Sequence, residues 1–254
     1  MSPQTVEKPD YGNWVSKKFI LVPGLLGLAF LGLVFLSLWW ILPALLFLAI
    51  AVYFGYARYR FSPQGGDVQG QIRALVLAHL DWDGKGQALD IGCGNAALTI
   101  ALARKYPRAA VTGIDYWGSS WEYSQAVCER NAQLEGVGER TTFRKASASK
   151  LPFDDGTFEA VVSNLTFHEV SDSSNKRDVM REALRVVKKG GKFAFQDLFL
   201  MKPVYGEPQE LLETIRSWGI EEVEFIETRQ ADFIPAALKL PFMVGTLGLI
   251  VGKK

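Results

Sequence analysis

The stretch at residues 89–98, LDIGCGNAAL, decides the fold. It joins a buried apolar strand pattern to a helical pattern through Gly92 and Gly94, whose missing side chains let the backbone approach a ligand closely. Asp90 lies just ahead of this turn, and Asp115 ends the next apolar stretch, AVTGID. Because parallel sheets bind ligands at the carboxyl ends of their strands, these residues predict a cofactor site at one edge of a sheet.

Helical and strand patterns alternate from residue 71 to residue 254. Such alternation is typical of a mostly parallel sheet with helices on both faces. The last two apolar stretches, VEFIET and TLGLIVG, have no helical pattern between them, so we expect an antiparallel edge. The predicted fold class is therefore α/β, with a Rossmann-like, doubly wound seven-stranded sheet whose last strand is antiparallel. Helices are expected at residues 72–80, 96–107, 121–136 and 176–191.

Residues 19–57 form a run of 39 residues without Asp, Glu, Lys, Arg or His. One membrane-spanning helix needs about 20 apolar residues, and a single helix of this whole run would be nearly twice as long as the ~30 Å hydrocarbon core. The run therefore predicts an α-helical transmembrane hairpin, with a buried hairpin in a soluble protein as the alternative. We expect the turn at residues 37–43, with Trp39 and Trp40 at the far interface and Pro43 starting the second helix.

Positive charges flank this run at both ends, with Lys17 and Lys18 before it and Arg58 and Arg60 after it. Since cytoplasmic flanks of membrane helices carry an excess of Lys and Arg, we expect both termini and the catalytic domain in the cytoplasm. The predicted organisation is a cytosolic N-terminal segment (1–18), the two-helix hairpin (19–57), a Pro/Gly-rich linker (58–70) and the catalytic domain (71–254). The linker and the apolar residues 233–245 are the two candidate covers for the site.

Charge, cysteine and histidine content argue against several classes of protein. The formal net charge is +1 and no basic stripe is present, so we expect no nucleic-acid partner. The two cysteines, Cys93 and Cys128, fit neither a disulfide framework nor a zinc spacing. With His79 and His168 as the two histidines, we also expect no metal site.

Two kinds of cofactor are compatible with the glycine turn. Gly92, Gly94 and Ala97 also satisfy the dinucleotide pattern G-x-G-x-x-G/A, which is weak on its own. Asp90 favours another cofactor, because a carboxylate at the strand end can meet a cationic amino group rather than a pyrophosphate. The final strand pair without a helix, and the lack of room for a separate catalytic domain, point the same way.

Several motifs, in the same order along the chain, resemble those of class I S-adenosylmethionine (SAM) methyltransferases. The stretches that carry the resemblance are ALDIGCGNAALTIALA, VTGID, LPFDDGTFEAVVSNLTFHEV and ALRVVKKGGKF, within residues 68–254. The most similar group includes the ubiquinone/menaquinone C-methyltransferases and many enzymes of small molecules. The resemblance implies SAM as the cofactor and methyl transfer as the reaction, and it does not extend to the apolar hairpin.

The resemblance also implies roles for residues around the turn. Asp90, Gly92 and Gly94 match the positions that hold the methionine end of SAM. Cys93 lies between the glycines and is expected to contribute its backbone N–H rather than its thiol. Asp115 matches the acidic residue that binds the ribose.

Further positions match the adenine and methyl-transfer regions of the family. Tyr116 and Trp117 flank the adenine by this resemblance, where an aromatic face can stack on a base. Ser147 and Ala148 occupy the stretch whose usual aspartate accepts a hydrogen bond from the adenine amino group. Asn164 matches a position that lines the methionine and methyl-transfer region.

Two positions depart from the family pattern. Ser147 places a hydroxyl where the family often has a carboxylate, and a hydroxyl is a weaker acceptor than a charged oxygen. Ala96 stands where the family usually has a third glycine. Both changes bear on the affinity for SAM rather than on its identity as the cofactor.

His168 is the candidate base or acceptor contact. Methyl transfer from a sulfonium has an activated leaving group, so a base is needed only when the nucleophile must lose a proton. Histidine titrates near neutrality and suits that role, while a local hydrogen-bonding role is the alternative.

The function predicted from the sequence is a membrane-anchored SAM-dependent methyltransferase. Its acceptor is expected to be small and lipophilic, such as a lipid, a quinone-like compound or a hydrophobic thiol, because anchoring raises the effective concentration of membrane-dissolved substrates. The alternatives are a non-catalytic SAM-binding membrane protein and a protein methyltransferase.

Overall fold

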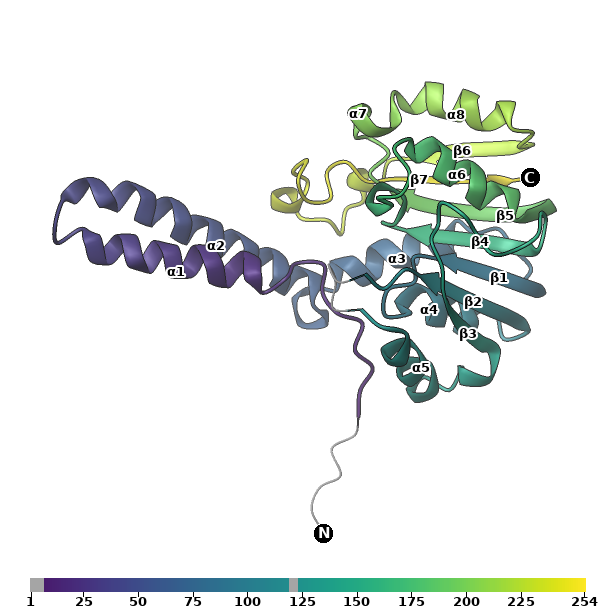
Figure 1. The fold of residues 1–254 in the computed structure, drawn as a ribbon, viewed down its shortest axis with the longest axis horizontal. Helices are drawn as coiled ribbons and strands as arrows, with labels where there is room; N and C mark the ends of the chain where they lie inside the picture. Colours follow the sequence, from purple (N-terminus) through teal and green to yellow (C-terminus); the bar gives the residue numbers. More distant parts are fainter. Residues whose placement is uncertain (1–6, 119–122) are drawn as a thin grey trace, which may run out of the picture. The chain divides into compact units, whose positions relative to one another are not determined.

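A seven-stranded sheet with strand order β3-β2-β1-β4-β5-β7-β6 forms the centre of the larger unit (Figure 1). The computed structural model describes residues 7–118 and 123–254. Neighbouring strands from β3 to β5 are parallel, and β7 runs antiparallel between β5 and β6. The predicted α/β fold class and its antiparallel last strand are confirmed. The strands are β1 (Gly86–Ile91), β2 (Ala109–Asp115), β3 (Thr141–Lys145), β4 (Phe158–Asn164), β5 (Val187–Asp197), β6 (Glu222–Ile226) and β7 (Gly248–Lys253).

Helices pack on both faces of this sheet because successive strand residues point to opposite faces. Leu89 and Ile91 of β1 contribute to the apolar core with α6 and α8, whereas Ala88 contributes to the core with α3, α4 and α5. Asp90 alternates with Leu89 and so faces the side of α4. The helices are α3 (Val68–Ala78), α4 (Ala97–Lys105), α5 (Gln125–Leu134), α6 (Lys176–Arg185), α7 (Lys202–Tyr205) and α8 (Pro208–Ser217).

One helix predicted in this unit was too long, and another helix was not predicted. The helix expected at residues 176–191 ends at Arg185, and β5 begins at Val187, paired with Phe158 of β4. Val186 and Val187 are β-branched and fully buried, so they fit a pleated core strand better than a further helical turn. Helix α8, between β5 and β6, had no predicted counterpart. Residues 121 and 122 of the helix expected at 121–136 lie outside the described residues.

Residues 13–72 form a second unit built on two apolar helices, α1 (Lys18–Leu33) and α2 (Ile41–Phe61). The two helices pack side by side, and a Cβ atom at Gly27 would lie 2.8 Å from Leu48 Cγ, so glycine permits this close approach. The chain reverses through residues 34–37 and the short 3₁₀ helix Leu38–Trp40, earlier than the expected turn at 37–43. Pro43 lies in the first turn of α2, where its missing N–H costs nothing.

The segment expected as a linker, residues 58–70, is largely helical. Helix α2 continues to Phe61, a 3₁₀ turn covers Pro63–Gly65, and α3 starts at Val68. Together with the preceding 3₁₀ turn, α2 forms a stretch of 24 residues from Leu38 to Phe61. Its most apolar 18 residues have a mean hydropathy of 2.1, so the stretch is long and apolar enough to cross a membrane. Helix α1, with 16 residues, is shorter. At about 1.5 Å per residue, it measures roughly 24 Å.

Residues 7–12 belong to the same unit as the sheet, although α1 and α2 follow them in the chain. Asn131 of α5 holds this segment with both ends of its amide. Its Oδ1 accepts the Asp10 N–H at 2.9 Å, and its Nδ2 donates to the Asp10 carbonyl at 2.8 Å. The same Nδ2 donates to the Asn95 carbonyl at 3.0 Å, and the Tyr11 hydroxyl donates to Glu135 at 3.0 Å. The N-terminal segment is thereby tied to the turn that follows β1.

Candidate functional site

The turn after β1 holds its two glycines in the left-handed region, with φ of +75° at Gly92 and +56° at Gly94. A Cβ atom at Gly92 would lie 1.9 Å from Thr166 Oγ1, so this position has no room for a side chain. The backbone N–H groups of Gly92 and Cys93 donate to the Ile114 carbonyl at 2.8 and 2.9 Å. These bonds fix the turn to β2, and the Cys93 N–H is therefore already used within the fold.

Asp115, at the end of β2, organises the neighbouring loop with its carboxylate. It accepts the Gly94 N–H at 2.9 Å and the Trp117 N–H at 2.7 Å. The Trp117 indole N–H donates to the Gly94 carbonyl at 2.9 Å, which joins this residue to the glycine turn. The Tyr116 ring is 64% exposed, with Lys145 Nζ 5.2 Å from its centroid. Tyr116 is therefore the more accessible aromatic face of the pair.

Asp90 is a carboxyl group inside the core, with only 1% of the residue exposed. The Thr99 hydroxyl donates to it at 2.6 Å. Burial raises the pKa of Asp90 to about 7, the nearby charge of Asp115 adds to this rise, and the positive charge of Arg73 in α3 opposes it. A buried carboxyl group with a pKa near neutrality gains from a cationic partner, because opposite charge stabilises its ionised form.

Ser147, directly after β3, has a carboxylate as its partner. Its hydroxyl donates to Asp172 Oδ2 at 2.8 Å, and the Ser149 hydroxyl donates to the same oxygen at 2.7 Å. These two bonds hold the pKa of Asp172 below its usual range. Ala148 between the two serines is buried. Ser147 stands where the family often has an aspartate. Asp172, from the loop after β4, thus brings a carboxylate next to this position.

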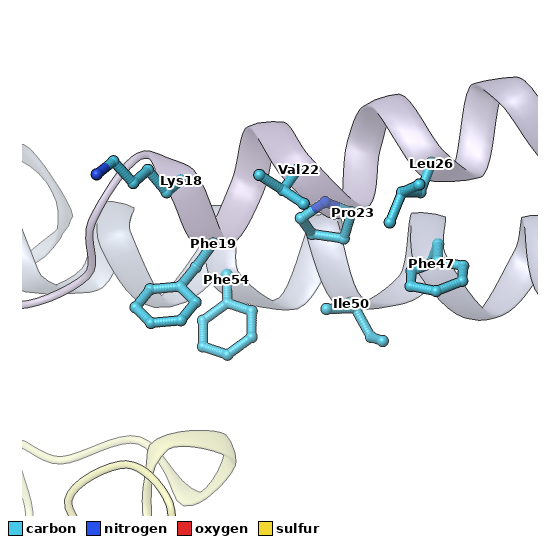
Figure 2. A pocket seen from close by; sticks show the side chains of 8 residues that line it. All are labelled: Lys18, Phe19, Val22, Pro23, Leu26, Phe47, Ile50 and Phe54. Atoms are coloured by element: carbon cyan, nitrogen blue, oxygen red, sulfur yellow. The ribbon is translucent and has the colours of Figure 1, made fainter.

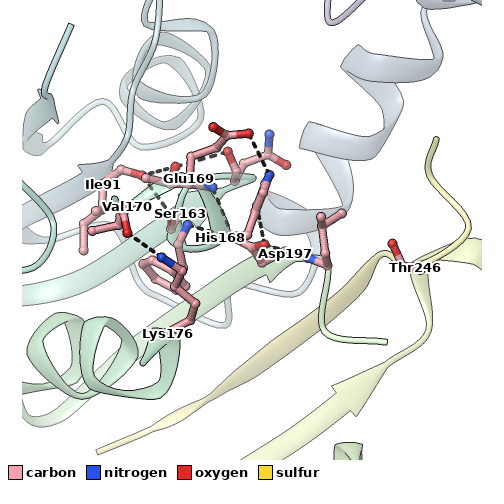
Figure 3. Close-up of polar contacts among 12 residues, drawn as sticks. Ile91, Ser163, His168, Glu169, Val170, Lys176, Asp197 and Thr246 are labelled. Atoms are coloured by element: carbon pink, nitrogen blue, oxygen red, sulfur yellow. Dashed lines mark hydrogen bonds and ion pairs between the residues drawn. The ribbon is translucent and has the colours of Figure 1, made fainter. Parts of the chain in front are cut away.

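His168 lies between two carboxylates in the 3₁₀ helix Phe167–Glu169 that follows β4 (Figure 3). Its Nδ1 is 2.6 Å from Asp197 Oδ1 at the end of β5, and its Nε2 is 3.3 Å from Glu169 Oε1. Asp197 is fully buried and also accepts the backbone N–H groups of Thr166 and Phe167 at 3.1 and 2.8 Å. Burial alone would lower the pKa of His168, but the bonds to Asp197 and Glu169 raise it to about 9. The imidazole is therefore protonated at neutral pH.

Asn164, the last residue of β4, carries an unsatisfied acceptor. Its Oδ1 is buried and has no hydrogen-bond partner among the described residues. Buried polar atoms in folded proteins nearly always have a partner, so a lone one at a strand end points to a donor on a bound molecule. Because β4 is parallel to β1, Asn164 lies at the same edge of the sheet as the glycine turn.

The sequence-derived site residues from Asp90 to His168 all lie at or just beyond the carboxyl ends of β1, β2, β3 and β4. Sequence reasoning missed Arg73, Asp197 and the steric partner Thr166. It considered Glu169 and Asp172 for the acceptor site, with solvated loop charge as the favoured alternative, and not Asp172 as the partner of Ser147. Asp197 ends β5, for which the apolar stretch at residues 192–199 indicates a strand, so its position near the carboxyl edge was a usable signal. Arg73 and Asp172 lie in a helix and a loop without a local motif, and their proximity to the site depends on the tertiary fold.

The residues at this edge fit SAM. The left-handed glycine turn brings half-buried backbone to the end of β1, Asp115 supplies a strand-end carboxylate suited to hydroxyl groups, and Asn164 offers a free acceptor. Asp90 adds negative charge, and Arg73 adds positive charge close to it, which suits the zwitterionic amino acid end of the cofactor.

Comparison with known proteins supports this interpretation. Residues 89–195 match the family model described as "Methyltransferase domain". The ubiquinone/menaquinone biosynthesis C-methyltransferase UbiE of Desulfotalea psychrophila is 36% identical over 120 residues, which cover 47% of this chain and 44% of that protein. The ribosomal RNA small subunit methyltransferase C of Shigella flexneri is 31% identical over 176 residues, or 67% of this chain and 48% of that protein. The chain thus spans about half the length of the curated relatives it matches.

Solved structures share the fold at low sequence identity. A geranyl diphosphate methyltransferase in complex with SAM has a TM-score of 0.55 at 15% identity, covering 78% of this chain and 89% of that one. The [4+2]-cyclase SpnF has a TM-score of 0.53 at 22% identity, covering 72% and 78%. The domain match, the relatives and the fold together show that this chain carries a domain of the class I methyltransferase family, whose cofactor is S-adenosylmethionine.

Proposed function

We propose that this protein is a membrane-anchored methyltransferase that acts on a small, lipophilic acceptor such as a lipid, a quinone-like compound or a hydrophobic thiol. The observation that carries the proposal is that the glycine turn, Asp115, Asn164 and the His168–Asp197 pair lie at one edge of the sheet. Bound SAM supplies a methyl group on a sulfonium, which is an activated leaving group. The protein's own residues then need to bind, orient and exclude water.

Asp115 binds the ribose in this proposal. Its oxygens already accept the N–H groups of Gly94 and Trp117, and each carboxylate oxygen can accept a further bond from a ribose hydroxyl. The exposed ring of Tyr116 stacks on the adenine. Asp172, held by Ser147, accepts from the adenine amino group in place of the family's aspartate.

Arg73 and Asp90 each bind one of the two charged groups at the methionine end of SAM in this proposal. Arg73 lies close enough to lower the pKa of Asp90, so the pair presents a cation and an anion beside the glycine turn. Arg73 pairs with the carboxylate of the cofactor, and Asp90 stabilises its ammonium group. Asn164 Oδ1 accepts a hydrogen bond from the bound molecule at the same edge.

His168 handles the proton of the acceptor. Asp197 accepts the Nδ1 proton at 2.6 Å and fixes the ring. Nε2, which faces Glu169 Oε1 at 3.3 Å, is then the nitrogen that exchanges a proton with a hydroxyl or thiol once the acceptor replaces Glu169 as its partner. Because the pKa of His168 is about 9, this base is unprotonated in only a small fraction of molecules at neutral pH. A carbon or amine nucleophile would use the same residue as a hydrogen-bond donor.

The path of the chain supports a two-span anchor. Residues 7–12 and 73–254 belong to one unit, so the segment between them leaves that unit and returns to it. If this segment crosses a membrane, it must cross an even number of times, because both of its ends join the same unit. Helix α1 must then span the membrane together with α2. The shorter α1 can span by local thinning of the bilayer, at a modest cost. Lys17, Lys18, Arg58 and Arg60 flank the hairpin at its open end, and an excess of Lys and Arg is typical of cytoplasmic flanks, which supports a cytoplasmic catalytic unit in this proposal.

The acceptor is tested by following the methyl group. The full chain in a mild detergent is incubated with methyl-labelled SAM and an extract of native membranes, and the label is then separated into lipid, protein and RNA fractions. We expect label in the organic-extractable lipid fraction. Label in precipitated protein would indicate a protein methyltransferase. Label in RNA would indicate an RNA methyltransferase. The Shigella relative is named as a ribosomal RNA methyltransferase, so the comparison does not support the expectation that no nucleic acid is bound. SAM binding without any transfer would make the protein a non-catalytic SAM binder.

A further inference from the structure

A groove of about 350 Å³ lies between α1 and α2 in the hairpin unit (Figure 2). Phe19, Val22 and Leu26 line it from α1, and Ile50 and Phe54 line it from α2. Its volume lies at the lower end of the ~300–1,000 Å³ range of ligand sites. A groove of this size takes one narrow apolar group.

The walls of the groove are apolar and partly rigid. The rings of Phe19 and Phe54 stack with centroids 5.2 Å apart, which fixes one end of the wall. Pro23 is buried between the helices, while Val22 remains 55% exposed at the edge of the groove. Among the described residues that line the groove, Lys18 alone is charged, and it lies at the beginning of α1 (Figure 2). The groove therefore combines an apolar channel with a cation at one end.

The length of the groove matches one leaflet of a bilayer. Lys18 and Leu26 are eight residues apart on a helix, which at about 1.5 Å per residue corresponds to ~12 Å. Half of a ~30 Å hydrocarbon core is ~15 Å. With Lys18 at the level of the headgroups, the apolar part of the groove thus extends through most of one leaflet.

We propose that this groove binds one acyl chain of an anionic phospholipid, with the lipid phosphate paired to the Lys18 ammonium. The inference rests on the membrane anchoring proposed above and adds a defined lipid site to it. The positive charge at this end of the hairpin favours an anionic headgroup. Lys17, Arg58 and Arg60 add to the charge of Lys18, and basic clusters at helix ends favour anionic lipids. The leaflet is the one on the side of the catalytic unit, where both ends of the hairpin emerge.

The site is tested on the full chain in detergent micelles by native mass spectrometry. The probes are phosphatidylglycerol and phosphatidylcholine with identical acyl chains. Val22→Phe fills the groove, and Val52→Phe is the matched control, since Val52 of α2 is 72% exposed and does not line the groove. Lys18→Gln removes the cation at the groove, and Lys17→Gln removes its neighbour.

We expect the wild-type chain to retain phosphatidylglycerol over phosphatidylcholine, and Lys18→Gln to reduce this preference about fivefold, the effect of one basic residue near the surface. Lys17→Gln should reduce it less. Val22→Phe should lower retention of phosphatidylglycerol at least fivefold, with Val52→Phe unchanged. Equal retention of both lipids, or equal effects of the two phenylalanine variants, would overturn the lipid site.

A separate measurement distinguishes this failure from failure of the proposed function. Carbonate washing of membranes that carry the full chain reports whether the hairpin is embedded. A chain that stays in the membrane but shows no lipid preference refutes the groove site alone. A chain that is washed off refutes the anchoring and the groove site together.

Discussion

Replacing Gly92 by alanine tests the packing at the centre of the site. The new Cβ atom would lie 1.9 Å from Thr166 Oγ1, 2.3 Å from Cγ2 and 2.6 Å from Cβ. Rotation of the threonine removes the first two clashes but breaks the bond from its hydroxyl to the Ile91 carbonyl at 3.0 Å. The third clash involves Thr166 Cβ, which rotation cannot move, so the backbone must shift.

The expected loss of stability follows from three contributions. A left-handed backbone at a non-glycine residue costs about 1–2 kcal/mol. The lost hydrogen bond costs about 1 kcal/mol, and overpacking costs about 1–3 kcal/mol. The total is roughly 3–6 kcal/mol, and at about 2–4 °C per kcal/mol the Tm should fall by about 6–24 °C.

Gly94→Ala is the matched control. Gly94 has φ +56°, so alanine there meets the same kind of backbone cost, but its Cβ would only touch the Tyr123 ring at 3.5 Å. The expected loss is about 1–2 kcal/mol. Thermal unfolding of the full chain without cofactor, followed by tryptophan fluorescence, measures both variants. Combining Gly92→Ala with Thr166→Gly removes the overpacking but not the loss of the Thr166 bond, so the cost should fall to about 2–3 kcal/mol. Equal Tm values for the two alanine variants would refute the role assigned to Thr166.

Four further predictions address the titrating residue, the cofactor and the N-terminal segment. The methyl-transfer rate to a hydroxyl or thiol acceptor should rise about tenfold per pH unit up to the His168 pKa of about 9. Glu169→Gln should move this profile to lower pH, because Glu169 helps to raise the pKa of His168. A flat profile in the wild type would exclude His168 as the base. The pKa of His168 in the folded chain lies above the value of about 6.5 in the unfolded chain. Protonated His168 therefore stabilises the folded state fully below pH 6.5, and this stabilisation is lost as the pH rises through 9. The Tm difference between wild type and His168→Gln should shrink over that range. Arg73→Gln should weaken binding of S-adenosylhomocysteine about 10–100-fold in calorimetry but leave 5′-methylthioadenosine, which lacks the amino acid end, within twofold; equal losses for both ligands would contradict the role of Arg73. Asn131→Ala leaves the N–H and carbonyl of Asp10 unpaired, so the Asp10 amide should exchange at least tenfold faster with deuterium, and unchanged exchange would show that this segment is held by other contacts.

The parts of the site that follow directly from a strand end were predictable from sequence. Gly92, Gly94 and Asp115 come straight after apolar stretches, and parallel strands bring their carboxyl ends to one edge. The alternation of patterns also predicted the sheet and its antiparallel strand. These features depend on local periodicity, which a sequence displays without any tertiary information.

The rest depends on contacts between distant parts of the chain. Asp172 reaches Ser147 across 25 positions, and Asn131 binds Asp10 across 121. No local pattern specifies either pair. The helix expected at residues 176–191 was too long because Gly190 and Gly191 indicated its end, whereas the β-branched Val187 pairs with Phe158 and starts a strand.

Ala96 is a position where the sequence shows the unusual residue and the structure shows its unusual backbone conformation. Its departure from the family's glycine is visible in the sequence, whereas its conformation is not. The structure places it at φ +68°, fully buried, just before α4. An alanine here carries the backbone strain that glycine would avoid, at a cost of about 1–2 kcal/mol. The turn retains its shape because the surrounding hydrogen bonds to β2 hold it.

A structure of the full chain with S-adenosylhomocysteine bound tests the central claim most directly. The account predicts the ribose hydroxyls on Asp115, the amino acid end beside Gly92 and Arg73, and the sulfur facing Asn164 and His168. A ligand bound away from the carboxyl ends of β1 and β2, or a sulfur that faces away from His168, would contradict it.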